Sequence, residues 1–272
     1  MAQTIIDFHT HIFPDRIARK TIGYLAEKGS IPAFSDGKLV SLLYKMEQAD
    51  VDVAVNLPVL TSPSQFDGVN RFAAELNREF ARKERRIISF AGIHPRCTNI
   101  AEKMAWIAAQ GFKGVKIHPD YQEIFFDDEG YLEILAAAKA NDLIVVTHAG
   151  LDYGFRGCPV RCAPERSARV IEMVPHSKLV LAHYGAMEMH DEVEALLCGK
   201  DVYFDTSFVL QYIDDDDFTR ILNKHGADRI LFASDSPWSS IVKDVARLRE
   251  LVPDGRVRKK IFSENAIKLL GI

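Results

Sequence analysis

Short apolar runs alternate with longer amphipathic stretches along the whole 272-residue chain. Strands that alternate with helices in this way form a parallel sheet with helical crossovers. Eight such units favour a closed (β/α)8 TIM barrel over an open sheet, since barrels of this kind have about 250 residues. We therefore expect one barrel domain over residues 1–272. The predicted strands are Thr4–Phe8, Val53–Leu57, Ile87–Ile93, Gly114–Ile117, Leu143–Thr147, Lys178–Ala182, Val202–Asp205 and Ile230–Ser234.

The stretches between these strands have the apolar spacing of helices. An open dinucleotide-binding sheet would need a glycine-rich turn after the first strand. The sequence there is Phe-His-Thr-His, which contains no glycine. The run Asp214–Asp217 suits the N-terminal end of a helix, where carboxylates are stabilising. The predicted helices are Lys38–Ala49, Gly68–Lys83, Ala101–Gln110, Tyr131–Ala140, Ala163–Met173, Asp191–Leu197, Phe218–His225, Lys243–Leu251 and Arg258–Leu270.

Charge and hydropathy exclude several classes of partner. The net charge of −4 argues against a nucleic-acid-binding protein, which needs a basic surface. No apolar run approaches the ~20 residues that span a bilayer, and no secretory leader precedes the first strand. We expect a cytoplasmic protein that acts on a small molecule and keeps its four cysteines, including Cys158 and Cys162, as free thiols.

Polar residues gather where the predicted strands end. In a parallel barrel the active site forms at the carboxyl ends of the strands. Only three of the nine histidines, His176, His190 and His225, lie elsewhere. The residues at or beside strand ends that can bind metal or move protons are His9, His11, His94, Lys116, His118, His148, His183, Asp205 and Asp235.

His9 and His11 begin the candidate metal site. Side chains two positions apart on a strand point to the same face, and neutral imidazole is a favoured ligand of zinc. His148 and Asp235, each at the end of a predicted strand, complete a four-ligand set. The alternative is that these histidines are ordinary core residues. A buried group of imidazoles without a metal ion is costly to desolvate, which favours the metal site.

Four motifs carry a resemblance to a known family: DFHTHIF in the first strand, THAG in the fifth, AHYG in the sixth and SDSPW in the eighth. In this order they resemble the amidohydrolase superfamily, most closely its amidohydrolase-2 branch. That branch contains hydrolases, lactonases and decarboxylases of the aminocarboxymuconate-semialdehyde type. The resemblance implies that His9, His11, His148 and Asp235 bind metal. It implies for His183 either a second-metal role or acid–base and substrate contacts, and it suggests a homodimer.

The number of metal ions depends on Lys116. Binuclear relatives carry a carboxylated lysine on the fourth strand that bridges two ions, and Lys116 has that position and faces inward. An uncarboxylated Lys116 would instead bind an anionic substrate. Because a bridging carbamate adds requirements, we favour one divalent ion, zinc, over two.

The resulting hypothesis is a hydrolase that uses a metal-activated water on an amide, lactone or related carbonyl bond of a small anionic substrate. Asp235 would move the proton of that water, and His183 would stabilise the oxyanion. His94, Arg96, Lys116 and His118 would bind the substrate. The alternatives are a metal-dependent non-oxidative decarboxylase of a small aromatic or muconate-like acid and, from another class, a metal-binding protein without turnover.

Two further segments are candidates for supporting roles. The glycine-rich loop Gly150–Cys162 suits a lid, with Asp152, Tyr153 and Arg156 as specificity residues. The segment Asp205–Ser207 would orient an imidazole. Tyr184 and Trp238 follow strand ends, where aromatic side chains either line the pocket or serve as packing.

Overall fold

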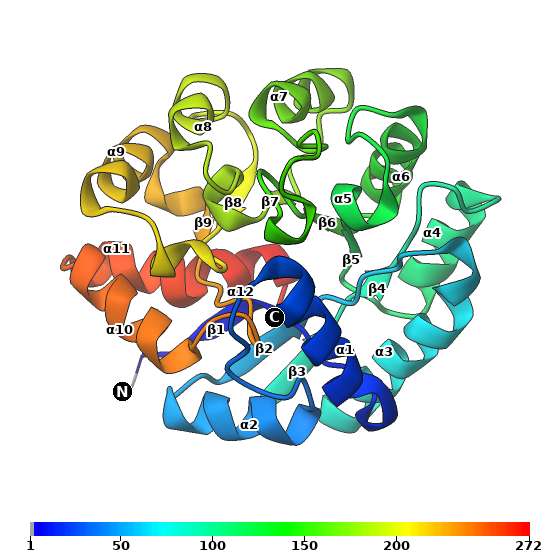
Figure 1. Ribbon diagram of the computed structural model, residues 1–272, viewed down its shortest axis with the longest axis horizontal. Helices are drawn as coiled ribbons and strands as arrows, with labels where there is room; N and C mark the ends of the chain where they lie inside the picture. Colours follow the sequence, from blue (N-terminus) through cyan, green and yellow to red (C-terminus); the bar gives the residue numbers. More distant parts are fainter. Residues whose placement is uncertain (1–2) are drawn as a thin grey trace.

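The computed structural model describes residues 3–272 and contains a ring of short strands surrounded by helices (Figure 1). Each predicted strand has a counterpart, displaced by a few residues at most. The predicted strand Ile87–Ile93 is divided in two at Phe90. The strands are β1 (Ile6–Thr10), β2 (Val53–Asn56), β3 (Arg86–Ser89), β4 (Ala91–Gly92), β5 (Gly114–Ile117), β6 (Ile144–Thr147), β7 (Leu179–Leu181), β8 (Tyr203–Asp205) and β9 (Ile230–Leu231).

The helices cover the outside of this ring. Every predicted helix is found, whereas α1 and α5 have no counterpart in the prediction. Asp214 accepts a hydrogen bond from the Asp217 amide at the start of α9, which confirms the predicted cap. The helices are α1 (Asp15–Gly29), α2 (Leu39–Gln48), α3 (Phe66–Phe80), α4 (Ile100–Ala109), α5 (Pro119–Gln122), α6 (Glu129–Ala140), α7 (Pro164–Met173), α8 (His190–Leu196), α9 (Asp215–His225), α10 (Ile241–Leu251), α11 (Gly255–Lys259) and α12 (Asn265–Leu270).

All strand pairs are parallel, as predicted for helical crossovers, but the ladder is not continuous. The strands form one sheet in the order β1-β2-β3 and a second in the order β4-β5-β6-β7-β8-β9. Between β9 and β1 no strand pair is formed. Backbone hydrogen bonds make that connection instead, from Phe8 N to Phe232 O (2.9 Å) and from Asp235 N to His9 O (2.8 Å). The expected closed barrel is therefore a ring of two sheets joined by such contacts.

A change of register in β1 sets the direction of the first site residues. Asp7 is opposite Ala54 on β2, and Thr10 is opposite Asn56, so β1 has one more residue than β2 between these pairs. An extra residue of this kind is a β-bulge, which re-aims the side chains beside it. Phe8 packs in the apolar interior with Val146 and Leu231. The next residue, His9, reaches the site at the strand ends.

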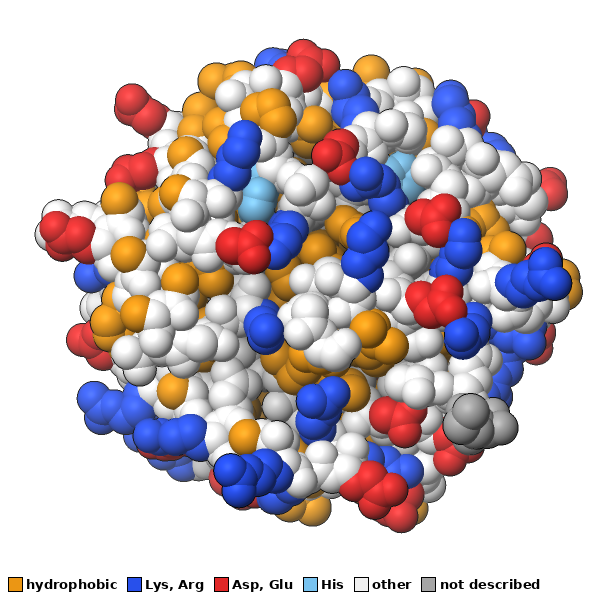
Figure 2. All heavy atoms as spheres, turned by 180° about the vertical axis from the view of Figure 1, so that it is seen from behind, with side chains coloured by type: hydrophobic (Ala, Val, Ile, Leu, Met, Phe, Trp, Pro, Cys, Tyr) orange, Lys and Arg blue, Asp and Glu red, His pale blue; other side chains and the backbone are white. Residues whose placement is uncertain are grey.

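The surface carries charges of both signs. On the face seen in Figure 2, Asp and Glu side chains lie among those of Lys and Arg. Within residues 3–272, no helix has the length and apolar character needed to cross a bilayer.

Candidate active site

Six strands bring their carboxyl ends to one side of the ring, and these ends carry the candidate residues. His9 lies in β1, and His11 follows that strand by one residue. Lys116 lies in β5, His148 follows β6, and His183 follows β7 by two residues. Asp205 ends β8, and Asp235 follows β9. Except for His11, whose side chain is 13% exposed, these residues are buried.

His9, His11 and Asp235 form the tightest cluster. The Asp235 Oδ1 atom lies 3.0 Å from His11 Nε2 and 3.5 Å from His9 Nε2. The three side chains offer ligand atoms that all lie within 4.8 Å of one another, close enough to share a metal ion. Asp235 has a positive φ of 67°, a conformation that is uncommon outside glycine and that recurs at functional sites.

His148 lies beside this cluster rather than within it. Its Nδ1 atom is 2.9 Å from His183 Nε2, and it is not among the three residues that share the 4.8 Å cluster. His183 in turn lies over His9, with ring centroids 5.7 Å apart. The structure therefore brings three of the four predicted ligands together and holds the fourth against His183.

The imidazoles of the site are oriented by acceptors on their outer nitrogens. Asp205 Oδ2 lies 2.9 Å from His9 Nδ1, and the Leu57 carbonyl lies 2.9 Å from His11 Nδ1. The Ser207 carbonyl lies 2.9 Å from His183 Nδ1. A proton held on the outer nitrogen leaves the inner nitrogen with a lone pair.

Asp205 and Ser207 thus orient imidazoles as predicted from the sequence. Thr206 differs, because its hydroxyl donates to the Ala233 carbonyl. Acceptors on the outer nitrogens are the usual companions of metal-binding histidines, since they fix the tautomer that presents a lone pair to the ion.

Burial favours the neutral forms of His9, His148 and His183. Desolvation lowers the pKa of His9 to about 4 and lowers the pKa of His148 well below its ordinary value. Burial pushes the pKa of Asp235 upward, but the neighbouring His9 and His11 bring it below its usual value. The site thus combines neutral imidazoles with an ionised carboxylate. This is the donor set that divalent metal ions such as zinc and manganese prefer, and the residues present fit such an ion.

Lys116 occupies a central position among these groups. Its Nζ atom lies 3.1 Å from His9 Nε2, which is the lone pair that a metal ion would use. The side chain is 1% exposed, and burial lowers the pKa of its amine to about 8. A metal ion at His9 Nε2 would therefore compete with Lys116, whose amine would have to leave this contact.

A second group of potential ligands, His118, His148 and Asp152, lies nearby. The rings of His118 and His148 are stacked with centroids 4.2 Å apart and an angle of 8° between planes. Imidazole binds metal in the plane of its ring, and the lone pairs of two parallel rings do not converge on one ion. The stacking therefore favours the His9, His11 and Asp235 cluster over this group as the metal site. Asp152 Oδ2 instead lies 3.4 Å from His118 Nε2.

Two predicted substrate-binding residues lie apart from the cluster. His94 is buried, and its Nδ1 accepts a hydrogen bond from the Arg96 amide, while the Arg96 side chain is exposed. Within residues 3–272, no hydrogen bond or ion pair joins either side chain to His9, His11 or Asp235. Both remain predictions.

Aromatic side chains border the site next to His183. Phe208 lies 6.5 Å from the His183 ring, measured between centroids, and packs 5.1 Å from Tyr212. Tyr153, from the predicted lid, lies 5.7 Å from Phe208. These rings form an apolar wall that suits a flat, unsaturated ligand. Tyr184 has no part in it, since it stacks on Phe218 with centroids 4.9 Å apart.

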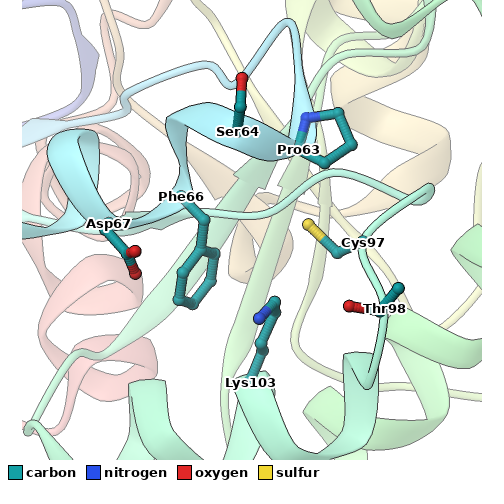
Figure 3. Close-up of a pocket in the computed structure, with 7 residues that line it drawn as sticks. All are labelled: Pro63, Ser64, Phe66, Asp67, Cys97, Thr98 and Lys103. Carbon is teal, nitrogen blue, oxygen red and sulfur yellow. The ribbon is translucent and has the colours of Figure 1, made fainter.

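A surface hollow lies away from these residues. Its lining residues come from the segment at the start of α3, from the loop that follows β4, and from α4 (Figure 3). Phe66, Cys97 and Lys103 belong to it, and none of the predicted site residues does.

The fold and the site define a class of protein: a parallel α/β barrel with histidines and a carboxylate suited to a divalent metal ion at its strand ends. The chain belongs to the amidohydrolase family, whose model Amidohydro_2 matches residues 6–272. This confirms the resemblance seen in the sequence. No curated protein matches the sequence.

Several solved structures share the fold at low sequence identity. A TIM-barrel protein from Bordetella bronchiseptica is similar with a TM-score of 0.78 and 18% identity, over 98% of each chain. A dihydroxybenzoic acid decarboxylase from Polaromonas sp. JS666, solved with manganese and 2-nitroresorcinol, has a TM-score of 0.71 and 16% identity, over 99% of this chain and 97% of its own. A 5-carboxyvanillate decarboxylase from Sphingomonas paucimobilis has a TM-score of 0.69 and 14% identity, over 100% of both chains.

Proposed function

We propose that the chain is a metal-dependent non-oxidative decarboxylase of a small aromatic or muconate-like acid. The sequence alone favoured hydrolysis and kept decarboxylation as the alternative. The family admits both reactions, and two of the similar structures described above are decarboxylases of benzoic-acid derivatives. These comparisons support the alternative better than the hydrolase.

The observation that carries this proposal is the aromatic wall beside the imidazole cluster. Phe208 lies against His183, and Tyr153 and Tyr212 extend the same wall. A planar acid that stacks there would bring its ring carbon near His183 and its carboxylate near the His9–Asp235 cluster.

The metal would be held by His9, His11, His148 and Asp235, and we propose one zinc ion per chain. When bound, the ion supplies a fixed positive charge that binds and polarises the oxygens of the substrate. The manganese in a similar decarboxylase makes manganese the second ion to test. Lys116, displaced from His9, and His118 would meet the remaining negative charge of the acid.

His183 is the proposed proton carrier. Its Nδ1 is tied to the Ser207 carbonyl, and its Nε2 faces the site. His183 would take a proton at Nε2 from a substrate hydroxyl and deliver it to the ring carbon that bears the carboxylate. The bond from this carbon to the carboxylate then breaks, its electron pair returns to the ring, and carbon dioxide leaves. The Asp235 carboxylate would stabilise the positive charge on His183 while His183 carries the proton.

The test offers the zinc- or manganese-loaded protein 2,6-dihydroxybenzoate, 5-carboxyvanillate, and a set of lactones and amides. We expect carbon dioxide release from one or more aromatic acids, and at least about 100-fold less from His183→Gln. The Tyr184→Phe variant is the control, because this buried tyrosine lies outside the site. Hydrolysis of a lactone or amide with no carbon dioxide release from any acid would overturn the proposal.

A further inference from the structure

His148 is the exception among the imidazoles of the site. The outer nitrogens of His9, His11 and His183 each have an acceptor, but His148 Nε2 has no hydrogen-bond partner within residues 3–272. It faces the Oδ2 atom of Asp120 at 3.7 Å, and this oxygen is also buried without a partner. Two unpartnered polar atoms that face each other need a physical reason, because each costs free energy when buried.

The reason is the position of one proton. The Ser207 carbonyl can only accept, so His183 Nδ1 carries the ring proton and His183 Nε2 has a lone pair. The 2.9 Å contact between His183 Nε2 and His148 Nδ1 then requires the proton on His148 Nδ1. Neutral His148 is left with a bare Nε2, and two acceptors face each other.

A metal ion at His148 Nδ1 removes this conflict. The ion needs the lone pair on Nδ1, so the single proton of the neutral ring moves to Nε2. There it points at Asp120 Oδ2, and both unpartnered atoms become paired. This arrangement has the same form as the contact of His9 with Asp205, in which a carboxylate holds the outer N–H of a metal-binding imidazole.

We infer that Asp120 is a positioning residue that selects the metal-binding tautomer of His148. Nothing in the sequence pattern had singled it out, although it follows His118 by two residues. It lies in α5, is 2% exposed, and accepts a hydrogen bond at Oδ1 from Arg161 Nη1 at 3.2 Å. Arg161 belongs to the predicted lid. Because Arg161 holds Oδ1, the other oxygen of Asp120, Oδ2, faces His148. The inference rests on the proposed function in one respect, the binding of metal by His148.

The Asp120→Asn variant tests the inference sharply. Arg161 donates to Oδ1, so the amide oxygen of asparagine stays there and its NH2 group faces His148 Nε2. That group donates to Nε2 and stabilises the tautomer with the proton on Nδ1, which cannot bind metal. We expect the zinc dissociation constant to rise about 10–100-fold, measured by competition with a chelator. The control is Asp127→Asn, which also removes an aspartate paired with arginine but lies away from His148.

A spectroscopic readout separates positioning from a structural effect. In ¹⁵N-histidine spectra we expect zinc to move the His148 proton from Nδ1 to Nε2 in the unaltered protein, with a smaller response in Asp120→Asn at the same zinc concentration. The signals are assigned with a His148→Gln variant. Zinc affinity and tautomer unchanged in Asp120→Asn would overturn the inference and leave the proposed function standing. Absence of zinc binding to the unaltered protein would overturn both.

Discussion

Asp205 shows at the scale of one residue how a carboxylate that is not a predicted ligand supports the metal site. Its Oδ2 holds His9 Nδ1, and its Oδ1 accepts hydrogen bonds from the backbone amides of His183 and Ser207. One buried side chain thus fixes the end of β1 against the ends of β7 and β8. Although burial opposes it, the contact with the His9 imidazole holds the pKa of Asp205 well below its usual value.

We therefore expect Asp205→Asn to weaken zinc binding about 10–100-fold, because the amide can present its NH2 group to His9 and leave the wrong tautomer. Chelator competition measures the affinity. Asp201→Asn is the control, since this exposed aspartate pairs with Arg229 at the surface. Equal affinities in the two variants would contradict the role given to Asp205.

The buried carboxyl of Asp244 should make the stability of the folded protein depend on pH. Burial raises the pKa of this α10 carboxyl from 3.8 to about 8. Between about pH 4 and pH 8 the folded protein keeps a proton that the unfolded chain has lost, so this group makes stability fall as the pH rises through that window. Asp244→Asn removes the ionisation and should gain at least about 1 kcal/mol relative to the unaltered protein between pH 5 and pH 8, about 2–4 °C in Tm.

Thermal unfolding at several pH values checks this, with Glu133→Gln on the exposed face of α6 as control. The same difference in Tm between Asp244→Asn and the unaltered protein at every pH would show that Asp244 ionises normally in the folded state.

At the scale of elements, the loop Gly150–Cys162 depends on a close backbone approach at Gly150. This residue has a φ of +83°, and a Cβ atom placed there would lie 2.0 Å from Met187 N. Gly157 in the same loop has a φ of +82° but open space around it. Alanine substitutions at Gly150 and Gly157 therefore distinguish the cost of backbone strain from the cost of steric overlap.

We expect Gly157→Ala to cost about 1–2 kcal/mol through its left-handed conformation alone. Gly150→Ala should cost clearly more and displace the loop that carries Asp152 and Arg161. Chemical denaturation measures both, and zinc affinity reports the displacement, because Arg161 holds Asp120. Equal losses of stability would mean that the loop can move away from Met187 at no cost.

The elements also show what can be read from the sequence and what cannot. The strands, most helices and the residues at strand ends follow from apolar periodicity and from the rule that places sites at carboxyl ends. Helix α1 was missed because Asp15–Gly29 buries only Ala18, Ile22 and Gly29, so its apolar face is narrow. The bulge in β1 and the break at Phe90 were missed because register depends on pairing between strands, which periodicity does not report.

For the site, residue type and position could be predicted but orientation could not. The side-chain directions of His148 and Asp120 depend on contacts between β6, β7 and α5. For the same reason, the separation of His148 from the His9–Asp235 cluster could not be derived from spacing along the chain.

At the scale of the whole molecule, the candidate metal site joins the two ends of the barrel. His9 and His11 come from the first strand, and Asp235 follows the last. Strands β1 and β9 are not paired with each other, and the chain after β9 is joined to β1 by backbone hydrogen bonds of Phe8, His11 and Asp235. A metal ion bound by these residues would therefore add a further link between β1 and the segment after β9.

An ion that binds only the folded state stabilises it by about 2.7 kcal/mol at a free concentration of 100 times its Kd. For a chain of this size we expect zinc to raise Tm by about 5–10 °C over the chelated protein. The His11→Ala variant should lose most of this increase. Its Tm with zinc is compared with its own Tm in chelator, because the variant also loses the contacts of His11 with Leu57 and Asp235. If zinc raised the Tm of His11→Ala by the same amount, the ion would bind elsewhere. It would then not stabilise the connection between β1 and the chain after β9.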